Sequence, residues 1–271
     1  MKLLLSLLYA SEGNYLVGID TDKQVVNQIE LVNISLKKVH SCSGMVYSGN
    51  YLFLSFLQHS KNDFVILNDI YENKCCTYEC QTTKQINGSL ISAYPGRIYS
   101  ISNNTKSINI ILFDPENTTF IGDSIHYTIN DFNLANFNIT SLCLWHSRWF
   151  IAIQSGTSGF IFELSNNRIV FADIDYPNNI FFNNDQKLCF FESNKGLFHC
   201  GNDIFYIGNV FLQGIIEDRV KGGYWIGCLT KNTNDSILIF MNYKGKISTP
   251  IKIPGHIVNI VKAEGVYAQC H

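Results

Sequence analysis

The sequence predicts an all-β protein, because short apolar runs alternate with turn sequences and no sustained helical periodicity interrupts them. Aromatic residues make up 13% of the 271 residues, and β-branched residues occur throughout, which favours strands packed face to face. The third observation is a unit of strands and turns that recurs along the chain. Together these features predict a fold built from repeated small sheets.

The clearest copy of this unit is the stretch YPNNIFFNNDQKLCFFESNKGLFHC, residues 176–200. It contains a short apolar run at 180–182, the turn sequence Asn183-Asn184-Asp185, a second run at 187–192 and a second turn sequence at 193–196. Asn and Asp favour such turns because their side chains hydrogen-bond to nearby backbone groups and tolerate left-handed geometry. The stretch therefore predicts three strands joined by two turns.

The same order of signals occurs in SGMVYSGNYLFLSF, NGSLISAYPGRIYSIS, TSLCLWHSRWFIAIQ, QGIIEDRVKGGYWIGC and HIVNIVKAEGVYAQC. The anchors of the six copies are 35 to 53 residues apart, at Gly44, Gly88, Ser141, Asn179, Gly214 and Ile257. A spacing near 40 residues, with about four short strands per unit, is typical of a β-propeller. We therefore expect one domain, residues 1–271, that forms a six-bladed β-propeller of four-stranded blades.

The two ends of the chain predict how such a ring closes. The last copy supplies an inner strand without outer strands, whereas the N-terminal segments KLLLSLLYA, YLVGIDTD and KQVVNQIEL supply strands without an inner one. Pairing the N- and C-terminal segments in one blade closes the ring and hides two sheet edges. Both 2–9 and 266–270 fit the second strand of that blade, and residues 1–10 also fit a short signal peptide.

The charge of the chain bears on its binding partners, and its cysteines bear on its cellular compartment. The net charge is -2 and only 15% of residues are charged, so we expect neither nucleic acid nor a membrane as partner. Cysteines such as Cys143, Cys189, Cys228 and Cys270 lie in apolar runs, which suits a reducing, cytoplasmic compartment. The cluster at 75, 76 and 80 falls on an expected outer strand, where alternate residues face opposite ways, so no metal site is predicted there.

A ring of polar residues is expected where the innermost strands begin. The residues that precede the six anchors are Ser43, Asn87, Thr140, Asn178, Gln213 and His256, and mainly apolar positions follow them. Two interpretations stay open: a hydrogen-bonded, water-filled channel lining, or a site for a small uncharged polar ligand. In the second, the first five residues bind the ligand, and His256 is the ring member that titrates near neutral pH.

The segment PNNIFFNNDQKLCFFES followed by NKGLF resembles the signature of the gluconolactonase and strictosidine-synthase-like group of six-bladed propellers. QGIIEDRVKGGYWIG is similar to an uncharacterised bacterial propeller family in which a Gly-Ile or Gly-Leu pair precedes a Tyr/Trp-rich strand. The first resemblance implies a channel cation held by Glu, Asn and Asp. Asn178 matches the Asn, but Gln213 and His256 stand where the carboxylates are expected. A neutral ring binds a hard cation poorly, so we expect no metal cofactor.

Two functional hypotheses follow. The first is a propeller that binds a small neutral polar ligand or a protein partner through the channel rim, with Trp145, Trp149 and the loop at 131–137 as a candidate exposed aromatic surface. The alternative is a metal-independent lactonase- or synthase-like enzyme, with His256 as the base and Asn87, Asn178 and Gln213 orienting the substrate. The sequence identifies no specific reaction, and the oligomeric state stays open.

Overall fold

The computed structural model of the chain describes the backbone of the strands and, in the second half, nearly every side chain. The described residues are 2–10, 13–20, 25–32, 42–48, 51–58, 61–68, 77–79, 82–86, 89–94, 97–104, 107–114, 119–120, 125–128, 137–233, 235–253 and 260–262. Two compact units divide the chain. Unit 1 is Met1–Ser102, Asn109–Ile125 and Ile253–His271, and unit 2 is Asn103–Ile108 and His126–Lys252.

Unit 1 contains a sheet to which both ends of the chain contribute. Its strand order is β26 (Ile260–Lys262), β1 (Lys2–Ala10), β2 (Gly13–Asp20), β3 (Val25–Val32) and β7 (Thr77–Glu79). Strand β1 pairs antiparallel with both β26 and β2, with Leu4 opposite Val261 on one side and Gly18 on the other. The segment 2–10 is therefore the second strand of this sheet, and 266–270 lies outside the described residues.

Two further sheets lie wholly or mostly in unit 1. One has the order β4 (Cys42–Ser48), β5 (Tyr51–Gln58), β6 (Lys61–Asn68) and β8 (Thr82–Ile86). The other has the order β9 (Ser89–Tyr94), β10 (Arg97–Asn104), β11 (Ser107–Asp114) and β12 (Thr119–Phe120), and β13 (Ile125–Thr128) also pairs with β11. The first strands β4 and β9 contact each other.

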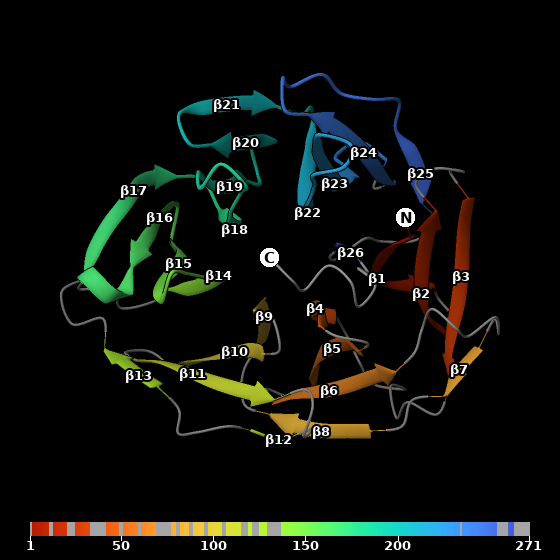
Figure 1. Ribbon diagram of the computed structural model, residues 1–271, viewed down its shortest axis with the longest axis horizontal. Helices are drawn as coiled ribbons and strands as arrows, with labels where there is room; N and C mark the ends of the chain where they lie inside the picture. The colour runs from red at the N-terminus through yellow and green to blue at the C-terminus, as the bar shows by residue number, and fades with distance from the viewer. Residues whose placement is uncertain are drawn as a thin grey trace. The chain divides into compact units, whose positions relative to one another are not determined.

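Unit 2 contains three four-stranded antiparallel sheets, each made of consecutive strands (Figure 1). The first contains β14 (Asn138–Trp145), β15 (Arg148–Ser155), β16 (Ser158–Glu163), the 3-10 helix η1 (Leu164–Asn166) and β17 (Arg168–Ile174). The second contains β18 (Pro177–Phe182), β19 (Leu188–Glu192), β20 (Leu197–Cys200) and β21 (Asp203–Tyr206). The third contains β22 (Val210–Asp218), β23 (Gly223–Thr230), β24 (Ser236–Asn242) and β25 (Ile251–Ile253).

The first strands of these sheets, β14, β18 and β22, are the inner strands of unit 2. Strand β18 contacts both β14 and β22, and the last strands β17, β21 and β25 lie on the opposite side (Figure 1). The prediction of an all-β protein with repeated four-stranded antiparallel sheets is confirmed. None of the described residues belongs to a helix that is long and apolar enough to cross a membrane.

The core of unit 2 lies between neighbouring sheets, so the middle sheet is buried on both faces. Phe190 of β19 packs with Phe150 and Ile161 of the sheet before it. Phe191, the next residue, packs with Tyr224 and Ile226 of the sheet after it. Because successive side chains of a strand point to opposite faces, burial of both faces requires a continuous apolar run. All five residues of β19, LCFFE, are buried.

The two turns of the middle sheet follow the prediction from sequence. Asn183 starts the first turn by accepting the Gln186 backbone N–H at 2.9 Å, and its side-chain Oδ1 accepts the Lys187 N–H at 2.9 Å. In the second turn Gly196 has a φ of +67°, and a Cβ there would lie 2.2 Å from the carbonyl oxygen of Gly208. Only glycine combines this left-handed geometry with so close an approach of backbone.

Candidate ligand site on the inner strands

Each inner strand of unit 2 carries a β-bulge close to its start. The pairing register skips Thr140 in β14 and Gln213 in β22, and in β18 the irregularity begins directly after Asn178. A bulged residue is unpaired in the ladder and bends the strand, which redirects its side chain. Three of the predicted ring positions therefore lie at or beside a bulge. Their role as ligand-binding residues stays a prediction.

The other predicted ring positions belong to segments described in less detail. The register of β4 skips Ser43 in the same way, between Cys42 and Gly44. In β9 the register shifts at Ile91, and Asn87 lies just before this strand, outside the described residues. His256, the predicted base, also lies outside them.

Side-chain hydrogen bonds at the bulges join β14 to β18. The hydroxyl of Thr140 donates to the carbonyl oxygen of Pro177 and lies 3.3 Å from that of Ala152. The next residue, Ser141, accepts the backbone N–H of Ile180 at its Oγ, 3.0 Å away. Both hydroxyls thus make contacts within the protein.

A second side chain joins β18 to β22. Asn179 donates from its Nδ2 to the carbonyl oxygen of Gln213 over 3.1 Å, and its own backbone N–H donates to Asn178 Oδ1 over 2.8 Å. Its φ of 50° is in the left-handed region, which Asn tolerates better than most residues. The Asn179 contact brings the bulge of β22 next to that of β18.

Two amide groups at these bulges have no hydrogen-bond partner within the described part of the chain: Nδ2 of Asn178 and the side-chain amide of Gln213. Both residues are partly exposed. The inner strands β14 and β18 carry no charged residue. The charged residues of β22, Glu217 and Asp218, lie at the end of the strand away from the bulge. The arrangement offers neutral donors and acceptors to a ligand.

A carboxylate lies at the end of β19. Glu192 is 7% exposed; Lys195 donates to its Oε1, as does the backbone N–H of Asp175 at 3.0 Å, and His199 lies 3.2 Å from Oε2. Burial tends to raise the pKa of this carboxyl, but the hydrogen bonds from Lys195, Asp175 and His199 outweigh it and lower the pKa below its usual value. Lys195 and Glu192 therefore neutralise each other.

The prediction of an exposed aromatic surface around Trp145 and Trp149 is wrong for Trp149, which is only 6% exposed. All six central residues of β15 are buried. Trp145 stacks on Phe182 with 4.2 Å between ring centroids, and the Arg148 guanidinium lies 4.7 Å from its ring. Residues 131–136 lie outside the described part.

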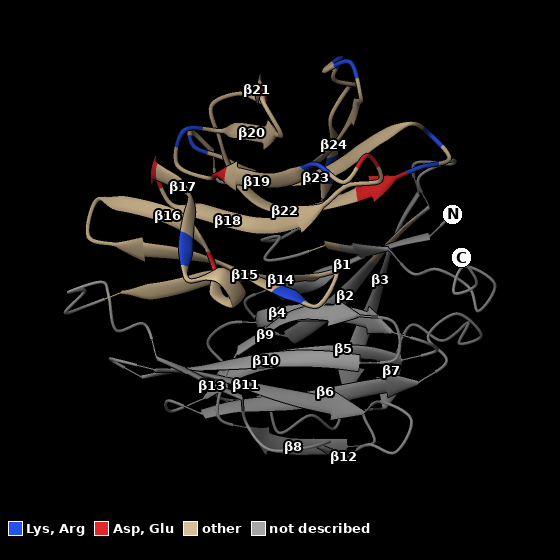
Figure 2. Cartoon of the chain, turned by 60° about the vertical axis from the view of Figure 1, so that its left-hand side comes forward, with Lys and Arg blue, Asp and Glu red and all other residues tan. Residues whose placement is uncertain are grey.

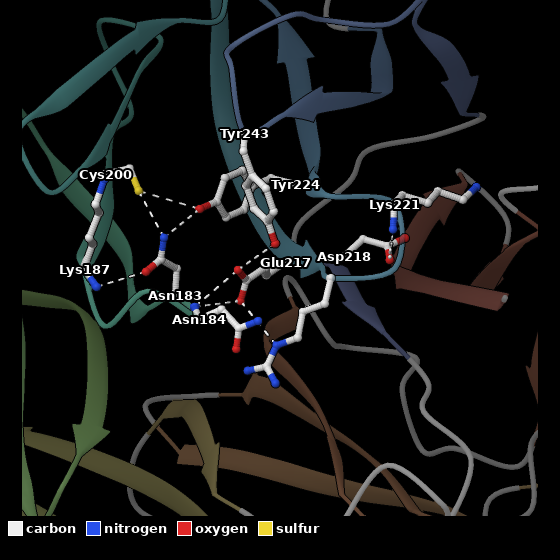
Figure 3. Close-up of polar contacts among 10 residues, drawn as sticks. Asn183, Asn184, Lys187, Cys200, Glu217, Asp218, Lys221, Tyr224 and Tyr243 are labelled. Carbon is white, nitrogen blue, oxygen red and sulfur yellow. Dashed lines mark hydrogen bonds and ion pairs between the residues drawn. The ribbon is translucent and has the colours of Figure 1, made fainter. Parts of the chain in front are cut away.

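Charged residues of the described part lie mainly at turns and strand ends (Figure 2). The sequence did not identify the polar group at the far end of β18 and β22, where Asn183, Cys200 and Tyr224 form mutual contacts (Figure 3). One signal pointed to it: Cys189 and Cys200 flank a predicted turn at matching positions. Where side chains are described, no three His, Cys, Asp or Glu residues form a group that could hold a metal ion.

Comparison with known proteins identifies the fold. No protein-family model and no curated protein matches the sequence. A chain of the nidogen/laminin complex is similar with a TM-score of 0.61 and 10% identity over 96% of this chain and 97% of that chain. TolB from Acinetobacter baumannii has a TM-score of 0.63 and 12% identity over 96% and 65%. A luciferin-regenerating enzyme has a TM-score of 0.57 and 11% identity over 83% and 81%.

These likenesses establish a β-propeller fold with repeated four-stranded blades. At such low identity they establish the fold alone.

Proposed function

We propose that this β-propeller has six blades and binds a small neutral polar ligand at its inner strands without transforming it. The blade number is supported by the six sheets found among the described residues. Closure of the ring is supported by the antiparallel pairing of β1 with β26, which brings the N-terminal strand into one sheet with a segment near the C-terminus.

The observation that carries the proposal is the pair of amides on Asn178 and Gln213. They come from adjacent inner strands, and the bond from Asn179 Nδ2 to Gln213 O holds the two strands together between them. Asn178 offers the N–H donors of its Nδ2, because its Oδ1 already accepts the Asn179 N–H, and Gln213 offers both donors and an acceptor. These groups suit hydroxyl and carbonyl groups of a ligand. Because β18 carries no charged residue and β22 carries none before Glu217, a neutral ligand is favoured over an anion.

The first experiment is a thermal-shift screen of the full chain against neutral monosaccharides and their lactones, with the corresponding sugar acids as a charged comparison. A ligand that binds only the folded protein stabilises it according to the ratio of its concentration to Kd. We expect a shift with one or more neutral compounds and none with the acids.

Variants then locate the ligand. Asn178→Ala and Gln213→Ala each remove a hydrogen bond of about 0.5–1.5 kcal/mol, so each should raise Kd roughly 2- to 12-fold. Asn202→Ala, in the exposed turn after β20, is the matched control and should leave Kd unchanged. Binding that is equally tight in all three variants would contradict the proposed site.

The enzymatic alternative makes a different prediction for the same ligands. If His256 is a base, the ligand is converted to product and His256→Ala stops turnover while the thermal shift remains. Turnover with this pattern would overturn a purely binding role. Silence across the whole panel, with a stably folded protein, would overturn the ligand proposal in favour of a protein partner at the rim.

A further inference from the structure

Two cysteines of the middle sheet lie directly opposite each other. Cys189 of β19 is the register partner of Cys200 of β20, and their Sγ atoms are 3.2 Å apart. Both are free cysteines, exposed by 0% and 6% respectively. The sulfur atoms are in contact, so a bond between them requires only a small displacement.

The backbone around the pair has the geometry that a disulfide needs. The N–H of Gly201 donates to the carbonyl oxygen of Leu188 at 2.9 Å, so these opposed residues form a hydrogen-bonded pair. The adjacent pair, Cys189 and Cys200, is therefore a non-hydrogen-bonded pair, with Cα atoms about 4.5 Å apart. A disulfide accepts Cα separations of about 4.4–6.8 Å. The two strands need not move apart or slide for the bond to form.

Cys200 is surrounded by hydrogen-bond donors (Figure 3). Asn183 donates from Nδ2 to its Sγ at 3.3 Å and also to the Tyr224 hydroxyl oxygen at 3.0 Å. Tyr224 Oη lies 3.6 Å from the same Sγ. Because the Tyr224 oxygen already accepts from Asn183, its hydrogen is available to the sulfur. Asn183 is itself fixed, since its Oδ1 accepts the Lys187 N–H.

These contacts favour the thiolate of Cys200 over that of its neighbour. The hydrogen bond from Cys189 lowers the pKa of Cys200 most strongly and outweighs burial, and the Tyr224 hydroxyl and the charge of Lys187 lower it further. The same hydrogen bond, together with burial, raises the pKa of Cys189. Cys200 is thus the sulfur that attacks, and Cys189 is the one that resolves.

We propose that Cys189 and Cys200 form a peroxide-sensitive dithiol that closes to a cross-strand disulfide. The Cys200 thiolate attacks one oxygen of hydrogen peroxide, the O–O bond breaks, and the sulfenic acid forms as hydroxide leaves. Cys189 Sγ then attacks the sulfenic sulfur, the S–O bond breaks, and the departing hydroxide takes the Cys189 proton to become water. Two thiols lose two electrons, and one peroxide becomes two waters.

A small oxidant suits this site. Cys200 ends β20 and is followed by the turn at 201–202, but the residue itself is only 6% exposed. Hydrogen peroxide is small enough to suit so little exposed a sulfur, whereas a bulky disulfide needs more room. Cys143 of β14 and Cys228 of β23, in the two neighbouring sheets, provide the contrast, because burial raises the pKa of each to about 12.

Peptide mapping of the intact protein tests the proposal. The native full chain is treated with hydrogen peroxide, quenched in acid, alkylated while unfolded and digested with trypsin. Cleavage after Lys187, Lys195 and Arg219 places Cys189 in the peptide 188–195 and Cys200 in 196–219. We expect these two peptides joined, lighter by two hydrogens than their sum, while Cys228 in 222–231 remains alkylated.

Three further results bear on the mechanism. In Cys189→Ser, Cys200 should stop at the sulfenic acid and react with a 1,3-diketone probe. In the wild type Cys200 should be oxidised at least about tenfold faster than Cys228. The linked peptides should return to two alkylated ones after dithiothreitol.

The proposal is overturned if Cys189 and Cys200 stay alkylated at peroxide levels that oxidise Cys228, or if Cys200 is linked mainly to another cysteine. The wild-type map decides this even if Cys189→Ser does not fold.

Discussion

Replacement of Asn179 by glycine and by alanine separates its two roles, the left-handed backbone and the bond between inner strands. Asn179 has a φ of 50° and donates to Gln213 O over 3.1 Å. Either replacement removes the donor. Alanine also has to occupy a left-handed conformation, whereas glycine does so without steric cost.

The magnitudes predict an unusual order of stability. Loss of the hydrogen bond costs about 1 kcal/mol in both variants. The left-handed conformation costs alanine about 1–2 kcal/mol more, whereas the greater freedom of glycine in the unfolded chain costs about 0.5–1 kcal/mol. Asn179→Ala should therefore be destabilised by roughly 2–3 kcal/mol and Asn179→Gly by roughly 1.5–2 kcal/mol. At a strand position with ordinary backbone geometry, the glycine variant would be less stable than the alanine variant.

Urea unfolding followed by tryptophan fluorescence measures both free energies. The control is Gln186→Gly in the exposed turn after β18, where φ is 60° and no bond joins inner strands. Relief of about 1–2 kcal/mol from the left-handed conformation, against about 0.5–1 kcal/mol for the greater freedom of glycine, should leave stability unchanged or raise it by up to about 1.5 kcal/mol. An alanine variant as stable as the glycine variant would refute the left-handed geometry. Wild-type stability in both would refute the bond to Gln213 as well.

Three further predictions concern the middle sheet. Phe198 is fully buried against Tyr224 and Phe191, so Phe198→Ala should lower the free energy of unfolding by about 3–5 kcal/mol in the same urea assay. Tyr224→Phe removes a hydrogen-bond donor to Cys200, so alkylation of Cys200 by iodoacetamide should require a higher pH than in the wild type. An unchanged pH profile of Cys200 alkylation would exclude the Tyr224 hydroxyl from thiolate stabilisation. Because the folded-state pKa of Glu192 is lowered, its ionised form stabilises the fold above the usual carboxyl pKa, and this stability is lost as pH falls through the lowered value. Glu192→Gln should therefore be less stable than wild type at pH 7, and the difference should shrink below about pH 4.5.

Local signals in the sequence were sufficient for the strands and turns of the middle sheet. The turn at Asn183 was predicted because Asn, Asn and Asp follow an apolar run, and Asn183 does cap it with its side chain. The expected strand at 187–192 corresponds to Leu188–Glu192. Both features depend on residues within a few positions of each other, which a single sequence contains in full.

Contacts between sheets could not be predicted in this way. The bond from Thr140 to the carbonyl oxygen of Pro177 depends on where β18 lies beside β14, and no local pattern encodes that distance. The burial of Trp149 likewise depends on how the chain packs around β15, which no local pattern encodes. The choice of β1 rather than 266–270 beside β26 is likewise a pairing between distant segments.

The most direct test of the ligand site is the side-chain amide spectrum of the labelled protein during titration with a ligand found in the thermal screen. The signals of Asn178 and Gln213 are identified by their loss in Asn178→Ala and Gln213→Ala. We predict that these two signals shift together with ligand concentration, whereas Asn179, whose Nδ2 is bonded to Gln213 O, shifts little. A ligand that stabilises the protein while the Asn178 and Gln213 signals stay in place would contradict the site.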